Sequence, residues 1–117
     1  EAAADLTHGL QARIDAVAAR TARLKDAERP RVACIEWFDP VWAGGHWVPE
    51  MLALAGGQDV LAQPGEPSKR IAWEEVVAAA PEAIVLMPCG YTIAKIRPHL
   101  GHLTARPGWK DLPAVKA

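Results

Sequence analysis

The sequence predicts an α/β fold in which a long α-helix precedes a mainly parallel central sheet. Two short apolar runs, residues 31–38 and 83–87, both end at a proline-containing loop and are both followed by a segment of helical character. Alternation of strands and helices is typical of parallel sheets that carry helices on their faces. In addition, residues 2–28 lack proline and repeat apolar residues at helical spacing, which predicts the preceding helix.

The predicted N-terminal helix carries one narrow apolar stripe. Its members are spaced by four, three, four and three residues: Leu10, Ile14, Val17, Thr21 and Leu24. Pro30 requires the helix to end before it, because the residue ahead of a proline disfavours helical geometry. At about 1.5 Å per residue the helix would be about 40 Å long, as long as a small domain is wide. We therefore expect a strut that packs across an architecture larger than this chain.

The chain that follows, as far as residue 67, is predicted to hold a buried strand, a helix and an edge strand. In order, these are a strand at 31–38, a loop at 41–45, a helix from 46 or 47 to 55, and an edge strand at 60–61. Asp39 and Pro40 interrupt the first strand. Pro49 suits a first helical turn, and Gly56 and Gly57 favour the stop of the helix.

The remaining residues are predicted to alternate helices and strands once more. In order, the elements are a short helix at 73–80, a core strand at 83–87, a helix at 91–103, a turn-rich loop at 106–111 and a third strand at 113–115. Pro81 closes the short helix, Pro88 interrupts the core strand and Thr92 is a candidate N-cap for the next helix. The predicted sheet is therefore mainly parallel and is built around three core strands.

Composition limits the classes of partner. Thirteen basic and fourteen acidic residues give a net charge of −1, and neither sign is clustered. No basic face for nucleic acid or anionic lipid is therefore expected, and the longest apolar run, 83–87, is too short to cross a membrane. Cys34 and Cys89 lack a Cys-x-x-Cys partner and lie in or beside apolar strands, so we expect two free thiols.

Two loops, residues 37–47 and 88–91, are expected at the carboxyl edge of the sheet, where open α/β sheets bind their ligands. Five of the seven aromatic residues lie in these loops: Trp37, Phe38, Trp42, Trp47 and Tyr91. Together they predict a rigid apolar wall of a ligand pocket, which also needs a few polar groups to orient the ligand. The candidates for these polar groups are Asp39, His46 and the backbone of Cys89 and Gly90.

Other interpretations of these residues stay open. The tryptophans could instead seal the end of the sheet, Trp37 above all. Gly44 and Gly45 could hold a phosphate at a helix N-terminus, although a close approach to a bulky neighbour is favoured. His99 and His102, spaced i and i+3, could share a helix face, but two ligands make a poor metal site. No serine or cysteine is paired with a base and an orienting acid, so the sequence predicts no catalysis.

Glu74 and Glu75 lie in the first turn of the helix predicted at 73–80. Carboxylates in that position interact favourably with the helix dipole. Alternatively, one of them is a surface carboxylate that pairs with an arginine of another protein. The residues alone do not choose between these interpretations.

Three segments of the sequence resemble a known family: WFDPVWAGGHWVPEMLALAGG at 37–57, PSKRIAWEEV at 67–76 and PEAIVLMPCGY at 81–91. They resemble the cobalamin-binding branch of the helix-linked, TroA-like periplasmic solute-binding proteins, which are the soluble receptors of ABC importers for vitamin B12. Relatives in that family serve iron–siderophores and haem. The resemblance implies an interlobe connecting helix, residues 1–29, followed by a truncated three-layer Rossmann-like C-terminal lobe, residues 30–117.

The resemblance also implies a function. The ligand, cobalamin or another corrinoid, would lie between two lobes and be delivered to the permease, with no cofactor and no enzymatic step. Trp37, Phe38 and Trp42 match aromatic residues of the family's cleft, and Glu74 matches the glutamate of this lobe that docks on the permease. Haem or an iron–siderophore is the alternative cargo, and an enzyme lobe or a signalling domain is the alternative class.

Location and assembly follow from the same resemblance. It implies a periplasmic or other extracytoplasmic protein, with or without a lipid anchor, whose signal lies outside this sequence. Without a second lobe the stripe of the N-terminal helix would be partly uncovered. Because exposed apolar surface of this kind usually finds a partner, we expect self-association through the helix.

Overall fold

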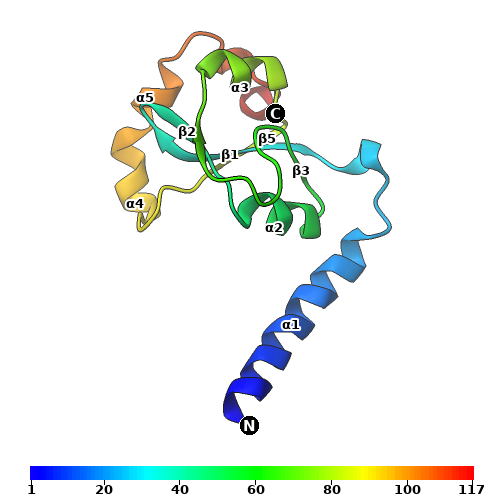
Figure 1. Cartoon of the computed structure of the whole chain (residues 1–117). Coiled ribbons are helices and arrows are strands. Elements are labelled where there is room, and N and C mark those ends of the chain that lie inside the picture. The colour runs from blue at the N-terminus through cyan, green and yellow to red at the C-terminus, as the bar shows by residue number, and fades with distance from the viewer.

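Helix α1, Ala2–Thr21, projects from an α/β lobe in the computed structural model, which describes residues 1–117 (Figure 1). The molecule is elongated, with extents of 52 × 33 × 25 Å. Helix α1 ends earlier than predicted, because the chain then turns and forms the short 3-10 helix η1, Asp26–Glu28. The Thr21 hydroxyl donates to the carbonyl of Leu54 at 2.7 Å, which anchors the last turn of α1 to the lobe.

Strand β1, Arg31–Phe38, is the centre of a five-stranded sheet. It pairs in parallel with β5, Ala83–Leu86, and with β3, Gln58–Asp59. Val32 pairs with residues of both strands, so β3 and β5 lie on opposite edges of β1. The parallel pairing predicted for the two apolar runs is therefore confirmed.

An antiparallel hairpin, absent from the prediction, extends the sheet. After a turn at Asp39 and Pro40, strand β2, Val41–Ala43, pairs with the second half of β1. Strand β4, Lys69–Arg70, then pairs antiparallel with β2. The segment 41–45, expected to be a loop, is thus a strand over its first three residues.

The hairpin contains a β-bulge. Ile35 pairs with Ala43 and Trp37 pairs with Trp42, so the partner strand offers nothing opposite Glu36. A bulge of this kind bends the strand and changes the direction of the side chains around it. Glu36 is therefore the extra residue of β1.

The edge strand expected at Val60 and Leu61 begins two residues earlier, as β3. Asp59 Oδ1 accepts hydrogen bonds from the N–H groups of Leu61 and Ala62 at 2.9 and 3.0 Å. This local turn competes with sheet pairing and directs the chain away from the sheet. The edge strand is present but displaced.

Two short helices agree with the prediction. Helix α2 spans Val48–Leu54 and has Pro49 in its first turn, while helix α3 spans Trp73–Ala79. Gly56, with φ of +95°, follows α2 in a conformation that suits glycine. Ala80 has left-handed geometry and ends α3.

The helix predicted at 91–103 is interrupted. It consists of three short pieces: α4, Ile93–Ile96; η2, Arg97–His99; and α5, Gly101–Thr104. Pro98 has no N–H group to continue an α-helix, which explains the interruption. Thr92 caps α4 as predicted, since its side-chain oxygen accepts from the N–H of Lys95 at 3.4 Å.

The third strand predicted at 113–115 is wrong. These residues belong to helix α6, Pro113–Lys116, whose first residue is a proline with the fixed φ that suits a helix start. The N–H of Ala114 donates to the carbonyl of Pro81 at 2.9 Å, which docks α6 near the start of β5. The preceding loop also contains the 3-10 helix η3, Trp109–Asp111.

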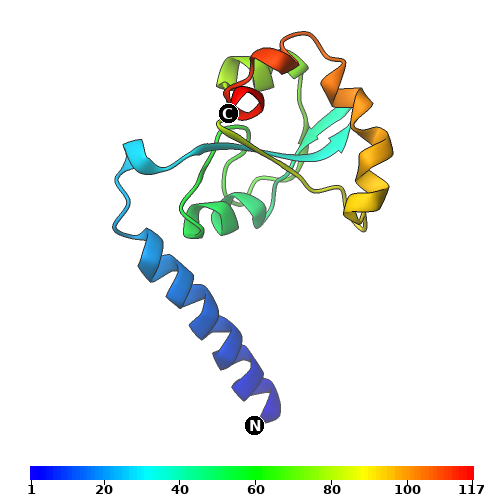
Figure 2. The ribbon, with the colours of Figure 1, turned by 180° about the vertical axis from the view of Figure 1, so that it is seen from behind.

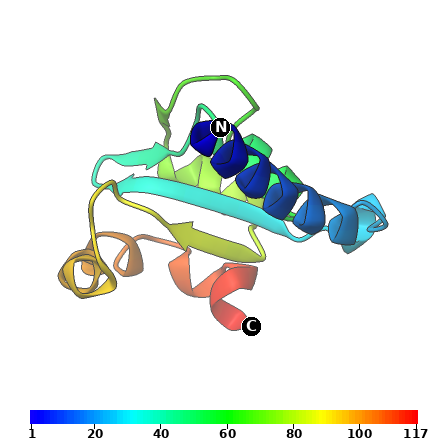
Figure 3. The same cartoon turned by 90° about the horizontal axis from the view of Figure 1, so that it is seen from below.

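The sheet lies between two groups of helices, which Figures 2 and 3 show from two further directions. In Figure 3, α1 and α2 lie on one side of the sheet, and α4, α5 and α6 lie on the other. The core on the latter side is made of buried apolar residues: Ile35, Phe38, Val41, Ala43, Ile71, Trp73, Val76, Leu103 and Leu112. The predicted three-layer α/β fold is confirmed. None of the helices combines the length and the apolar character needed to cross a bilayer.

Candidate ligand-binding site

The loops that follow β1 and β5 meet at the carboxyl edge of these parallel strands. Trp37, near the end of β1, contacts Tyr91 of the second loop edge-to-face, with ring centroids 5.7 Å apart. The ring of Phe38 lies nearly parallel to that of Trp37 at 6.3 Å. Aromatic pairs at such distances attract one another. The structure thus brings three of the predicted site residues together.

Trp37 borders two cavities. The larger, of about 280 Å³, is lined by Glu36, Trp37, Trp42 and Cys89. The smaller, of about 80 Å³, is lined by Trp37, Phe38, Asp39, Tyr91, His99 and His102. Trp37 and Trp42 expose 39% and 37% of their surface, so neither is sealed in the core. Both indoles are available to a ligand at this edge.

Asp39 lies against α5 and the residues that follow it. Its Oδ1 accepts from Arg106 Nη2 at 3.3 Å, and its Oδ2 lies 3.9 Å from His102 Nδ1. The same guanidinium group donates to the carbonyls of Phe38 and His102 at 3.1 and 2.9 Å and lies 5.7 Å from the ring of Trp73. Since Asp39 is exposed, the ion pair contributes about 0–1 kcal/mol. Its main effect is to hold the hairpin turn in place.

Glu36 belongs to a second polar group. Its Oε2 accepts from the Ser68 hydroxyl at 2.6 Å, and the Ser68 oxygen accepts from the Gly45 N–H at 3.2 Å. A Cβ atom on Gly45 would lie 2.4 Å from the backbone of Pro67 and Ser68. The close approach favoured for the two glycines is therefore confirmed at Gly45, where the neighbour is backbone rather than a bulky side chain. At Gly44 a Cβ atom would make only ordinary contacts, the nearest at 3.5 Å.

His46 and Trp47 lie at the start of α2, apart from the Trp37 cavities. The His46 N–H donates to the carbonyl of Glu66 at 2.6 Å, and the His46 carbonyl accepts from the N–H of Gly65 at 3.1 Å. Trp47 is 68% exposed and its ring lies 5.6 Å from that of His46. Neither residue lines a cavity with Trp37, and their place in the cleft wall stays a prediction.

Four residues of this edge were not predicted as site residues: Glu36, His99, His102 and Arg106. The ring of His99 lies 5.8 Å from that of Tyr91 and 6.1 Å from that of His102. The i, i+3 spacing of the histidines was the only signal in the sequence, and it did not indicate which residues they face. In residues 1–117 no three His, Cys, Asp or Glu side chains converge as a metal site would require.

The two cysteines are free, as predicted, but differ in environment. Cys34 is buried in β1, where burial and then the nearby charge of Asp59 raise the pKa of its thiol from 9.0 to about 11. Cys89 is exposed and lines the larger cavity together with Glu36. A ligand at this edge would therefore cover Cys89 and leave Cys34 unaffected.

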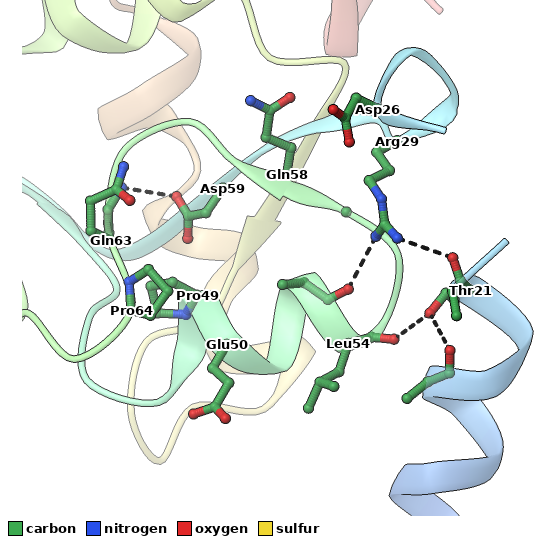
Figure 4. A pocket seen from close by; sticks show the side chains of 15 residues that line it. Thr21, Asp26, Arg29, Pro49, Glu50, Leu54, Gln58, Asp59, Gln63 and Pro64 are labelled. Carbon is green, nitrogen blue, oxygen red and sulfur yellow. Dashed lines mark hydrogen bonds between the residues drawn. The ribbon is translucent and has the colours of Figure 1, made fainter. Parts of the chain in front are cut away.

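The largest hollow, of about 760 Å³, lies where α1 joins the lobe (Figure 4). Two of its polar side chains, Thr21 and Arg29, make structural contacts between α1 and the lobe, while Asp59 Oδ2 is buried without a hydrogen-bond partner. Arg29 donates to the carbonyls of Ala53 and Thr21 at 3.3 and 3.1 Å, beside the bond from Thr21 to Leu54. Because these bonds anchor the helix, we place the candidate site at the carboxyl edge of the sheet instead.

The apolar stripe of α1 is exposed, as expected. Leu10, Ile14 and Val17 face Met51 and Leu54 of α2 across an apolar groove of about 560 Å³. Self-association through this face stays a prediction. Sedimentation at high protein concentration checks it, and a clean monomer would contradict it.

The two glutamates at the start of α3 have different environments. Glu75 accepts the N–H of Ala72 at 2.8 Å, and its own N–H donates to the Ala72 carbonyl at 3.0 Å. This pair of bonds stabilises the helix start in place of a side-chain N-cap. The side chain of Glu74 is exposed and makes no hydrogen bond or ion pair in residues 1–117. The local structural role therefore belongs first to Glu75.

Solved structures that are similar to this chain include the following three. An ABC transporter substrate-binding protein from Listeria monocytogenes EGD-e matches over 97% of this chain and 44% of its own, with 21% identity and a TM-score of 0.78. An ABC-type Fe3+-hydroxamate transport system from Saccharomonospora viridis DSM 43017 matches over 97% of this chain and 38% of its own, with 22% identity and a TM-score of 0.73. The periplasmic vitamin B12 binding protein BtuF of Vibrio cholerae matches over 93% of this chain and 39% of its own, with 19% identity and a TM-score of 0.64.

These similarities, at low sequence identity, concern the fold. The chain spans less than half the length of each of the three structures. No curated protein matches the chain in sequence. Residues 1–117 match the sequence pattern of the periplasmic binding protein family. The chain therefore belongs to the periplasmic binding protein family.

Proposed function

We propose that the chain is the connecting helix, residues 1–29, and the C-terminal lobe, residues 30–117, of the solute-binding component of an ABC importer. This component works outside the cytoplasmic membrane, free in the periplasm or attached by a lipid. It binds a large planar metal chelate, a corrinoid such as cobalamin, between two lobes and delivers it to the permease. It does not change the ligand chemically.

The aromatic cavity at the carboxyl edge of the sheet carries this proposal. Trp37 and Trp42 present half-exposed indole rings to it, and Tyr91 supports Trp37 from the other side. Rigid apolar walls with a few polar groups are typical of small-molecule sites. The matched structures extend well beyond the part that this chain covers, which supports the proposal that a second lobe forms the opposite wall.

The choice of cargo rests on the resemblance of residues 37–57 and 81–91 to the cobalamin-binding branch. The names of the matched structures include vitamin B12 and Fe3+-hydroxamate as cargoes of those proteins. An iron–siderophore is therefore the second candidate within the same class, together with haem, which the resemblance also implies. An enzymatic function has no comparable support, because no nucleophile with a base and an orienting acid lies at this edge.

A visible-absorbance titration of the intact two-lobed protein with cyanocobalamin, haem and a ferric hydroxamate tests the proposal. We expect saturable, one-to-one binding of cyanocobalamin and much weaker binding of the other two. Tight binding of haem or the hydroxamate alone would change the cargo. Binding of no ligand would contradict the function.

The second part of the proposal is that the protein docks on the permease, and that Glu74 is the residue of this lobe that contacts the permease. The Glu74 carboxylate is exposed. Its neighbour Glu75 instead accepts the N–H of Ala72 at the start of α3. An arginine of the permease can pair with such a carboxylate. A pair at the rim of an interface contributes mainly to association rate and orientation.

Glu74→Ala and Glu75→Ala form a matched pair for testing this role. We expect Glu74→Ala to leave melting temperature and ligand affinity nearly unchanged while reducing uptake and salt-sensitive binding to the permease. Glu75→Ala should lose about 1 kcal/mol of folding stability and transport normally. Normal uptake by the Glu74 variant would remove the docking role.

A further inference from the structure

The β-bulge brings Glu36 to the aromatic cavity. Glu36 has no partner on β2, because its two neighbours in β1 take the paired positions. Bulges are frequent beside functional sites, where they redirect a side chain that would otherwise follow the alternation of the strand. Here the cavity wall includes Glu36 beside Trp37 and Trp42. A half-buried carboxylate therefore lies among indole rings.

The carboxylate is held in one orientation. Ser68 has a single hydroxyl proton, and the hydroxyl donates to Glu36 Oε2 at 2.6 Å while its oxygen accepts from the Gly45 N–H. The Gly45 backbone is buried and closely packed against residues 67 and 68, so the base of this chain of bonds is rigid. A carboxylate has about four acceptor positions, and Ser68 occupies one. Glu36 has no ion pair, which leaves acceptor capacity for a ligand.

No lysine or arginine lines either cavity at this edge. The guanidinium of Arg106 is already bonded to Asp39 and to the carbonyls of Phe38 and His102. Arg70 pairs opposite Trp42 on β4, but it is exposed and outside the lining of both cavities. Sites that recognise carboxylates or phosphates usually present arginine or lysine to them. The larger cavity at this edge instead presents the hydrogen-bond acceptors of the Glu36 carboxylate.

We propose that Glu36 is a specificity-determining residue of the cavity. Its carboxylate accepts a hydrogen bond from an N–H or O–H group on the rim of the ligand and disfavours a ligand with a carboxylate at that point. This inference rests on the proposed function and narrows its ligand class. A corrinoid carries neutral primary amides around its ring, whereas haem carries two propionates. Glu36 therefore favours an amide-rimmed chelate over an acid-rimmed one.

The test compares cyanocobalamin with the monocarboxylic acids formed when one of its peripheral amides is hydrolysed. The intact two-lobed protein and its Glu36→Gln variant are titrated with each ligand. We expect the unaltered protein to prefer cyanocobalamin over at least one monoacid by about tenfold or more, the scale of one hydrogen bond to a charged group. Glu36→Gln should weaken cyanocobalamin binding by about tenfold and reduce that preference, because glutamine also offers a donor.

Arg70→Gln is the matched control, since it changes one charge at the same sheet edge outside the cavity. We expect it to leave both affinities and their ratio unchanged. Glutamine at position 36 can still accept from Ser68, so the melting temperature of Glu36→Gln should also be nearly unchanged. An unchanged ligand ratio in a folded Glu36→Gln protein would overturn the role of Glu36 and leave the corrinoid function standing. Preference for haem over cyanocobalamin would overturn both.

Discussion

The two halves of β1 differ in what they do. Residues 32–35 are fully buried and pair with β5 along one edge and with β3 and β2 along the other. The second half begins with the bulged Glu36, continues with the half-exposed Trp37 and ends with the buried Phe38. The first half belongs to the core of the lobe, and the second half borders the candidate cavity.

This difference has a physical basis. A strand between parallel neighbours is buried on both faces, which requires apolar side chains at consecutive positions. The second half pairs with a short hairpin strand, which tolerates a bulge and leaves part of the edge open. Stability and recognition are therefore assigned to neighbouring residues of one strand. Substitutions on the two sides of the bulge should separate the two properties.

Ile35→Ala should have the largest effect on stability. Ile35 is fully buried in the core cluster with Phe38 and Val41. Removing its side-chain carbons leaves a cavity and should lower the free energy of unfolding by about 2–5 kcal/mol. Chemical denaturation of the intact protein measures this change. Ligand affinity of the molecules that remain folded should be unaffected, and a loss of affinity without a loss of stability would contradict the division of β1.

Trp42→Ala should show the opposite pattern. Trp42 pairs with Trp37 across the hairpin and lines the larger cavity. Losing a large apolar wall should weaken ligand binding by about 1–3 kcal/mol. Isothermal titration with cyanocobalamin measures the affinity, and a thermal melt shows whether the fold persists.

Trp47→Ala is the matched comparison for Trp42→Ala. Trp47 is even more exposed but lines no cavity with Trp37, so in the intact protein its effect on affinity reports whether the cleft extends to the start of α2. We expect a loss within the same range, at its lower end. If both variants bind like the unaltered protein, the tryptophans are structural and the site assignment is wrong.

The first half of β1 was predictable and the second half was not. The continuous apolar run at 32–35 indicates a buried strand by itself, as does the run at 83–86. The bulge at Glu36 depends on the register of β2, a three-residue strand too short to show a period. The sequence places Trp37 and Tyr91 at one edge, but it contains no signal for the hydrogen bond between Ser68 and Glu36.

The C-terminal part shows the same limit. Pro113 followed by the apolar residues Ala114 and Val115 is compatible with a strand or a helix. The hydrogen bond from the Ala114 N–H to the Pro81 carbonyl stabilises the helix. Likewise, the positions of His99 and His102 relative to Tyr91 follow from the interruption of the helix near Pro98. Contacts between distant segments decide these cases, and local sequence patterns do not contain them.

Thiol labelling gives a sharper view of the two regions. Cys89 is exposed in the larger cavity, whereas Cys34 is buried in the first half of β1. With a thiol reagent at pH 8 the folded protein should label at Cys89 alone, and saturating ligand should slow this labelling. Denaturation should expose the second thiol. Rapid labelling of Cys34 in the folded protein would contradict the burial of this half of the strand, and unchanged Cys89 labelling with ligand bound would contradict the site.

The expected effect with the narrowest range of conditions is the contribution of Cys34 to stability, which changes only at high pH. Burial, with a further contribution from the charge of Asp59, raises the pKa of the Cys34 thiol from 9.0 to about 11 in the folded protein. Between these pH values the unfolded chain loses the thiol proton while the folded protein keeps it, so stability falls as pH rises from 9 towards 11.

Other groups also titrate in this range. The quantity to measure is therefore the difference in pH dependence between the unaltered protein and Cys34→Ala, with Cys89→Ala as the control. The slope should be less steep in Cys34→Ala, because that variant lacks the buried thiol whose pKa is raised, and it should be unchanged in the control Cys89→Ala. Equal slopes in all three proteins would mean that Cys34 is more accessible to water than the first half of β1 requires.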